Sequence, residues 1–101
     1  MIFKPVTTEA ALGTSTGASS NVSSSEFVKL FNSANQNTQH LVTLEQADGT
    51  DIGTFTVGGH ESIIIHKEPT DKLFAADAAV LACGVVVIDV SQPRVFSKPI
   101  K

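Results

Sequence analysis

The side chains in this sequence best suited to metal or redox chemistry are three histidines and one cysteine. His40 and His60 are twenty positions apart and His60 and His66 are six apart, and neither spacing matches a common zinc pattern. Cys83 has no second thiol to pair with, and its apolar neighbours predict a buried, inert side chain. These residues predict no metal site, no cofactor and no intrachain disulfide.

Three short sequence patterns have residue types that catalysis or ion binding uses. Residues 48–51, Asp-Gly-Thr-Asp, offer oxygen atoms to calcium but lack the spacing and closing Glu of a calcium loop, so Asp48 is better explained as a turn former. Residues 13–17 resemble a phosphate-binding loop without its Gly-Lys-Ser/Thr ending, which favours a flexible linker. Residues 13–17 also match the letters Gly-x-Ser-x-Gly, but they lie in a predicted loop and not in the strand-to-helix turn that a nucleophile elbow requires. We therefore predict no catalytic, cofactor-binding or metal-binding residue, and no enzyme.

Length and composition restrict the remaining classes. A chain of 101 residues fits one domain, and a hydrophobic fraction of 42% with six Phe and neither Trp nor Tyr predicts a mainly aliphatic core. Only 17% of residues are charged and the net charge is -3, which argues against a nucleic-acid partner. No signal peptide is recognisable and no apolar run reaches the roughly 18 residues of a membrane helix. We expect a protein made in the cytoplasm that has no membrane partner.

The strongest structural signal is a β-hairpin over residues 39–57. Two runs rich in β-forming residues, 41–44 and 52–57, flank the Asp48-Gly49 pair. Gly49 can adopt the positive φ that a type I′ turn or a bulged type I turn requires.

Further strands are predicted over residues 27–31, 62–67 and 85–90. The three successive isoleucines at positions 63–65 suit a strand that is covered on both faces. A short helical turn is expected over residues 73–76, and over residues 75–81 a short helix competes with a strand. The pattern predicts an all-β fold, a small antiparallel sandwich or barrel of five to seven strands with at most one helical turn.

The chain divides into four segments. Residues 1–8 form an N-terminal strand or arm, and residues 26–90 form the sandwich core. Residues 9–25 are rich in Ser, Thr and Gly and contain too few large apolar groups to anchor a core element, so they predict a flexible loop or arm that crosses a neighbouring subunit or frays. Residues 91–101 predict an extended basic tail that could dock on the acidic body of another copy.

Residues 41–71 carry a family resemblance. They contain, in order, a strand, an Asp-Gly-Thr turn, an Ile-Gly-Thr strand, a Gly-Gly turn and a strand that ends in Lys-Glu-Pro-Thr-Asp. This order resembles small β-sandwich structural proteins of tailed bacteriophages, notably marine and cyanobacterial ones. With residues 79–82 included, the resemblance covers about forty residues.

The resemblance implies a structural virion component. The leading expectation is a capsid decoration or cement protein that binds the lattice of the major capsid protein, with other copies of itself as further partners in a homo-oligomer. A neck, tail or fibre component is the alternative within the same class. From another class, a carbohydrate-binding sandwich module remains open, although the sequence lacks Trp and Tyr as sugar-stacking platforms.

Overall fold

The computed structural model describes residues 2–88, which form eight strands and one short 3-10 turn. The strands are β1 (Ile2–Pro5), β2 (Ala10–Ala11), β3 (Phe27–Asn32), β4 (His40–Glu45), β5 (Asp51–Val57), β6 (Ser62–His66), β7 (Lys72–Ala75) and β8 (Val80–Ile88), and the turn η1 covers Thr16–Ala18. The all-β prediction is confirmed. The strand count exceeds the expected five to seven because the two-residue β2 adds one.

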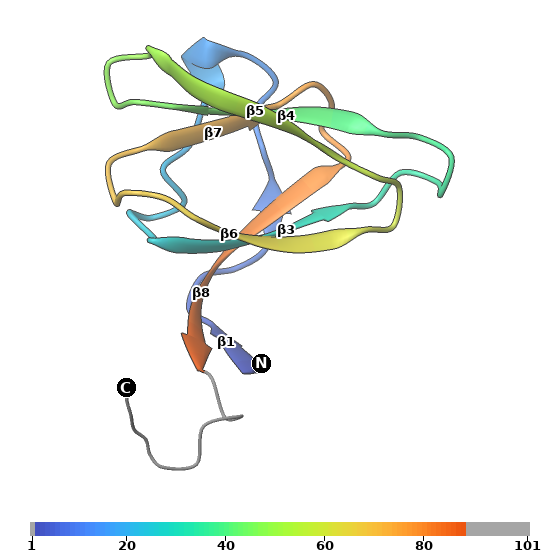
Figure 1. Ribbon diagram of the computed structural model, residues 1–101, viewed down its shortest axis with the longest axis horizontal. Coiled ribbons are helices and arrows are strands. Elements are labelled where there is room, and N and C mark those ends of the chain that lie inside the picture. Colours follow the sequence, from blue (N-terminus) through green and yellow to red (C-terminus); the bar gives the residue numbers. More distant parts are fainter. Residues whose placement is uncertain (1, 89–101) are drawn as a thin grey trace.

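The strands form two antiparallel sheets that face each other (Figure 1). The first has the order β1-β8-β3-β6, with β2 also paired to β8, and the second has the order β5-β4-β7. The arrangement is therefore a sandwich, one of the two architectures that the sequence predicted.

The core lies between the sheets and is mainly aliphatic. Along β3 every second side chain, Val28, Leu30 and Asn32, is fully buried, because alternate residues of a strand point to opposite faces. Val42 and Leu73 of the second sheet are equally buried and face them. Period-two burial of small aliphatic side chains thus holds the two layers together.

The β4–β5 hairpin has the turn that its residues predict. Gly49 takes a φ of 92°, and its N–H donates to the Gln46 carbonyl at 2.9 Å. The Asp48 carboxylate accepts a hydrogen bond from the Thr50 N–H at 2.9 Å, so Asp48 serves the turn. These contacts are those of a type I turn followed by a glycine bulge.

Residues 12–25, here called the closing segment, differ most from expectation. Leu12 and Val22 are buried members of the core, with exposures of 4% and 9%. Ser20 exchanges two backbone hydrogen bonds with Leu73 of β7, and Gly13 accepts one from a further β7 residue. The expectation that this segment cannot anchor a core element is wrong, because two apolar side chains suffice where the backbone is bonded to a strand edge.

Two further expectations fail in the second half of the chain, and one open alternative there is decided. Residues 72–75 form β7 rather than part of a helical turn, because they complete the edge of the second sheet beside β4. No helix forms over residues 75–81, and β8 already begins at Val80. The isoleucine-rich β6 was expected to be covered on both faces, yet it is an edge strand whose Ile63 is 37% exposed.

Cys83 is buried as predicted, and its thiol donates to the Thr7 carbonyl at 3.2 Å. The expected tail at residues 91–101 lies outside the described residues.

Candidate interaction surface

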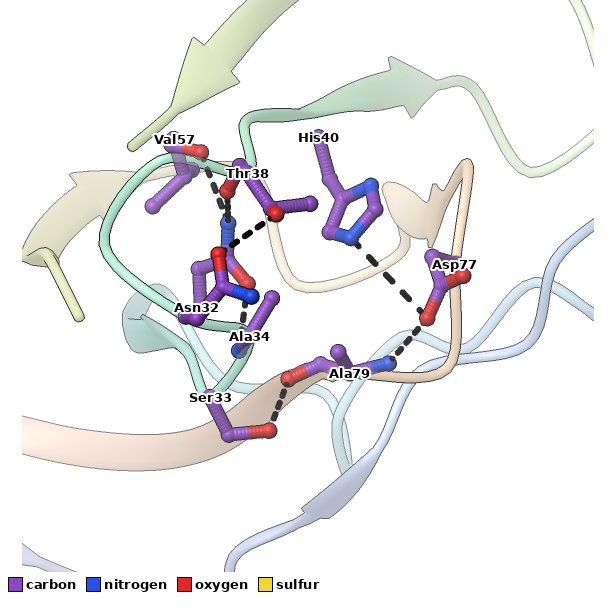
Figure 2. Close-up of polar contacts among 9 residues, drawn as sticks. Asn32, Ser33, Ala34, Thr38, His40, Val57, Asp77 and Ala79 are labelled. Atoms are coloured by element: carbon purple, nitrogen blue, oxygen red, sulfur yellow. Dashed lines mark hydrogen bonds and ion pairs between the residues drawn. The ribbon is translucent and has the colours of Figure 1, made fainter. Parts of the chain in front are cut away.

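The three histidines lie in different places. His40 begins β4, and its Nε2 is 4.0 Å from the Asp77 carboxylate (Figure 2). His60 stacks on the Phe31 ring, with centroids 6.4 Å apart, and His66 lies against another ring of β3 at 5.1 Å. Within residues 2–88 no group of His, Cys, Asp and Glu side chains is arranged to hold a metal ion.

The polar cluster around Asn32 is structural. The Asn32 amide nitrogen donates to the carbonyls of Thr38 and Val57, each at 3.0 Å, and its oxygen accepts from the Ala34 N–H at 3.0 Å (Figure 2). Asn32 has no solvent exposure, so these bonds supply what water would otherwise provide. The cluster fixes the β3–β4 loop against the end of β5.

A buried carboxylate joins the closing segment to the hairpin. Glu45, at the end of β4, is fully buried, and its Oε2 accepts a hydrogen bond of 2.6 Å from the Thr16 hydroxyl. Hydroxyl donors at Ser19 and Thr16 lower the pKa of Glu45 below its ordinary value of 4.5, because they stabilise the charged form. The sequence predicts a flexible linker over residues 13–17. Nothing in their pattern indicates the hydrogen bond from Thr16 to Glu45, which is 29 positions away.

An exposed apolar stripe lies on the ribbon formed by β1 and the end of β8. In the ribbon, Ile2 pairs with Ile88 and Lys4 with Val86, so these side chains share one face. The apolar stripe comprises Ile2 (52% exposed), Val6 (53%), Val86 (49%) and Ile88 (45%). Figure 1 shows this ribbon extending from the first sheet, beyond the other strands of the sandwich.

The stripe continues the core face of β8. Val80 and Ala82 point into the core, and strand alternation keeps Val86 and Ile88 on the same side. Gly84 pairs with Val28, the last fully buried residue of β3 in this direction. Beyond that point the same side of β8 is exposed. Residues 85–88 belong to the strand predicted over residues 85–90, and β8 confirms that strand as far as the described residues reach.

A hollow of about 430 Å³ lies beside the stripe, between the ribbon and the end of the closing segment. Its lining includes Val6 and Val86 on one side and Ser23 and Ser24 on the other. Val22, Ser23 and Ser24 all have positive φ values of 51°, 55° and 59°, a conformation that costs non-glycine residues energy. The Asn21 side chain accepts the Ser24 N–H at 3.2 Å and helps hold this strained turn beside the ribbon.

Comparison with family models, with curated proteins and with solved structures gives no match to this chain. Within the described residues, no helix is long and apolar enough to cross a membrane. The candidate interaction surface is therefore the apolar stripe on the ribbon.

Proposed function

We propose that this chain is a structural protein that binds other protein subunits, and specifically that it decorates or cements the capsid of a tailed bacteriophage. The observation that carries the proposal is the apolar stripe. Its residues Ile2, Val6, Val86 and Ile88 account for half of the eight large apolar side chains exposed in the described chain. These apolar side chains surround Lys4 on one face of the ribbon, and exposed apolar surface of this kind is typical of a surface that binds another protein.

The stripe offers a modest binding energy per copy. Each of its four side chains is about half exposed, so covering one by a partner contributes about 1 kcal/mol. A repeating lattice presents the same contact many times, so a few kcal/mol per copy strengthen a shell. This energy scale suits a decoration or cement protein.

The choice of a capsid rests on the sequence resemblance of residues 41–71 to phage sandwich proteins. The matching residues form most of β4, all of β5 and β6, and the turns between them, on the sandwich rather than on the ribbon. The ribbon is therefore free to bind the major capsid protein while the resembling part supplies the scaffold.

Co-sedimentation with capsids that lack this protein tests the proposal. We expect the wild-type chain to bind, and the paired substitution Val86→Asp with Ile88→Asp to abolish binding while the chain stays folded. Ile52→Asp is a matched control, because Ile52 is 49% exposed on β5, away from the ribbon. Failure of the wild-type chain to bind expanded shells, or equal binding by the paired variant, contradicts the proposal.

Copy number separates the capsid from the neck, tail or fibre. A decoration protein approaches the abundance of the major capsid protein in purified virions. A far lower copy number in quantitative mass spectrometry would contradict the capsid assignment and favour a neck, tail or fibre part.

A further inference from the structure

The free edge of β6 is a second unusual surface, and it is separate from the apolar stripe. Within residues 2–88, β6 pairs with β3 alone. The Lys67 N–H donates to the Glu26 carbonyl, and the Asn32 N–H donates to the Glu61 carbonyl, which fixes the hydrogen-bonding phase of the β3–β6 ladder. By alternation, residues 61, 63, 65 and 67 face β3, and the backbone groups of residues 62, 64 and 66 face outward.

This edge lacks the usual protection of edge strands. Natural sheet edges commonly carry proline, outward charges or bulges that prevent pairing with another chain. The five residues of β6 include neither proline nor a Lys, Arg, Asp or Glu, and their pairing with β3 is regular. Ile63, Ile64 and Ile65 occupy its centre, the composition of a strand covered on both faces. Within the described chain that cover is only partial, because Ile65 packs against the core while Ile63 is 37% exposed.

The sequence of β6 is complementary to itself in the antiparallel direction. If two copies meet with Ile64 opposite Ile64, Ser62 lies opposite His66, and the whole strand is used. The outward backbone groups then face each other, and three such pairs with two bonds each give about six hydrogen bonds between copies. On the core side Ile63 faces Ile65, which covers the exposed part of Ile63.

Charge at the ends of the strand fits the same alignment. One position beyond the strand, Glu61 of one copy lies opposite Lys67 of the other. Lys67 is 2% exposed, and its ammonium donates to the carbonyls of Glu68 and Pro69 at 3.2 and 3.5 Å. No carboxylate of the described residues lies within 4.0 Å of it, and burial lowers its pKa. In this alignment Glu61 of the second copy adds a negative charge near Lys67, besides that of Asp71 in the same chain.

The surface beside the edge also has room for the second copy. A shallow hollow of about 290 Å³ on the outer face is lined by Phe3, Lys29 and residues 62–64. In the alignment described above, the Ile64 side chain of the second copy projects on this face next to the hollow.

We propose that two copies of this chain associate through their β6 strands, antiparallel about a two-fold axis at Ile64, so that their five-stranded sheets form one continuous sheet. A single five-residue edge buries less area than the roughly 1,200 Å² of a standard stable interface. We therefore expect a weak dimer that dissociates on dilution, and capsid binding through the stripe is not required for it.

Sedimentation equilibrium of the full chain over a range of concentrations tests the dimer. Ile64→Lys places two ammonium groups opposite each other across the axis, and we expect it to raise Kd by at least about 100-fold. Thr54→Lys is the matched control, since Thr54 faces outward on β5, the free edge of the other sheet, and we expect no change in Kd. Ser62→Pro removes one outward N–H at the first residue of the strand, where proline is tolerated, and weakens the dimer without adding charge.

A disulfide tests the alignment itself. Two directly opposite residues of an antiparallel hydrogen-bonded pair have Cα atoms about 5.5 Å apart, within disulfide reach. We expect Ile64→Cys to give a cross-linked dimer on mild oxidation and Thr54→Cys to give none.

Three results would overturn the proposal. The first is a chain that remains monomeric at all concentrations. This includes a monomer in which another segment of the same chain covers β6 and protects its amides from hydrogen exchange. The second is a dimer whose Kd is unchanged by both Ile64→Lys and Ser62→Pro. The third is a dimer that Ile64→Cys fails to cross-link. Loss of capsid binding with an intact dimer would contradict the proposed function and leave the dimer standing.

Discussion

The two lateral sides of the sandwich are treated differently by the chain. On one side, the closing segment bonds to β7 through Gly13 and Ser20, and β1 and β2 pair with β8. On the other side, the edges of β5 and β6, joined by a turn over residues 58–61, have no further strand partner among the described residues. The strand edges are thus covered by other segments on one side of the sandwich and left without a strand partner on the other. A polar, glycine-containing segment is enough to cover one side, and an isoleucine-rich edge is available for pairing on the other.

The largest expected effect compares one buried leucine with one exposed isoleucine. Leu12 anchors the closed side at 4% exposure, so Leu12→Ala should lower the free energy of unfolding by about 2–4 kcal/mol. Ile63 on the open side is 37% exposed, so Ile63→Ala should cost about 1 kcal/mol in the monomer. Urea denaturation at low protein concentration measures both. Equal losses would show that the closing segment is not part of the core.

An intermediate effect is expected from acid. The pKa of Glu45 is lowered in the folded state, so its contribution to stability is present above the unfolded value of about 4.5. That contribution is lost as the pH falls through the lower, folded pKa. Thr16→Val removes the hydroxyl bonded to Glu45, so it should destabilise the protein more at pH 7 than at pH 3.

Thermal unfolding of the wild type and the Thr16→Val variant across this pH range provides the measurement. Ser33→Ala is a control, because the Ser33 hydroxyl bonds to the neutral Ala79 carbonyl. A Thr16→Val loss that is the same at both pH values would contradict a charge-dependent contact.

The smallest effect comes from the strained turn of the closing segment. Ser24 is exposed with a φ of 59°, and Ser24→Gly relieves the strain of this conformation. Glycine loses more conformational entropy on folding, so the net stabilisation should be about 0.5 kcal/mol. Ser15 has an extended φ of -151°, so Ser15→Gly should destabilise it by a similar amount. Chemical denaturation resolves the two signs, and stabilisation by both variants would contradict the role assigned to the positive φ.

Local turn chemistry made much of the fold predictable. Asp48 and Gly49 specify the β4–β5 hairpin by themselves, and the β-rich runs on either side specify its strands. The edge position of β6 was not predictable. Three successive isoleucines at positions 63–65 indicate a strand that other residues cover, but not whether those residues belong to the same chain or to another. The ordered packing of residues 12–25 was not predictable either, because it depends on contacts with distant residues. Their stability depends on Leu12, Val22 and a hydrogen bond to Glu45 from distant Thr16, and none of these produces a periodic pattern.

The candidate site was predictable only in part. The run at residues 85–88 correctly predicted a strand, and alternation places Val86 and Ile88 on one face. Sequence alone does not reveal where the opposite sheet stops covering that face. The stripe is exposed because β8 extends beyond the opposite sheet that covers its core face. Only the tertiary structure shows where that sheet ends.

The long strand β8 has a mechanical consequence. The apolar stripe occupies the end of β8, and the preceding part of the strand is bonded along its length to β3, from Val80 opposite Asn32 to Val85 opposite Phe27. A pull on the stripe directed along β8 loads these backbone bonds in parallel, as a shear, rather than one after another. A partner bound at the stripe is in this way tied to the centre of the first sheet, and tension between the two is resisted by the whole β3–β8 ladder.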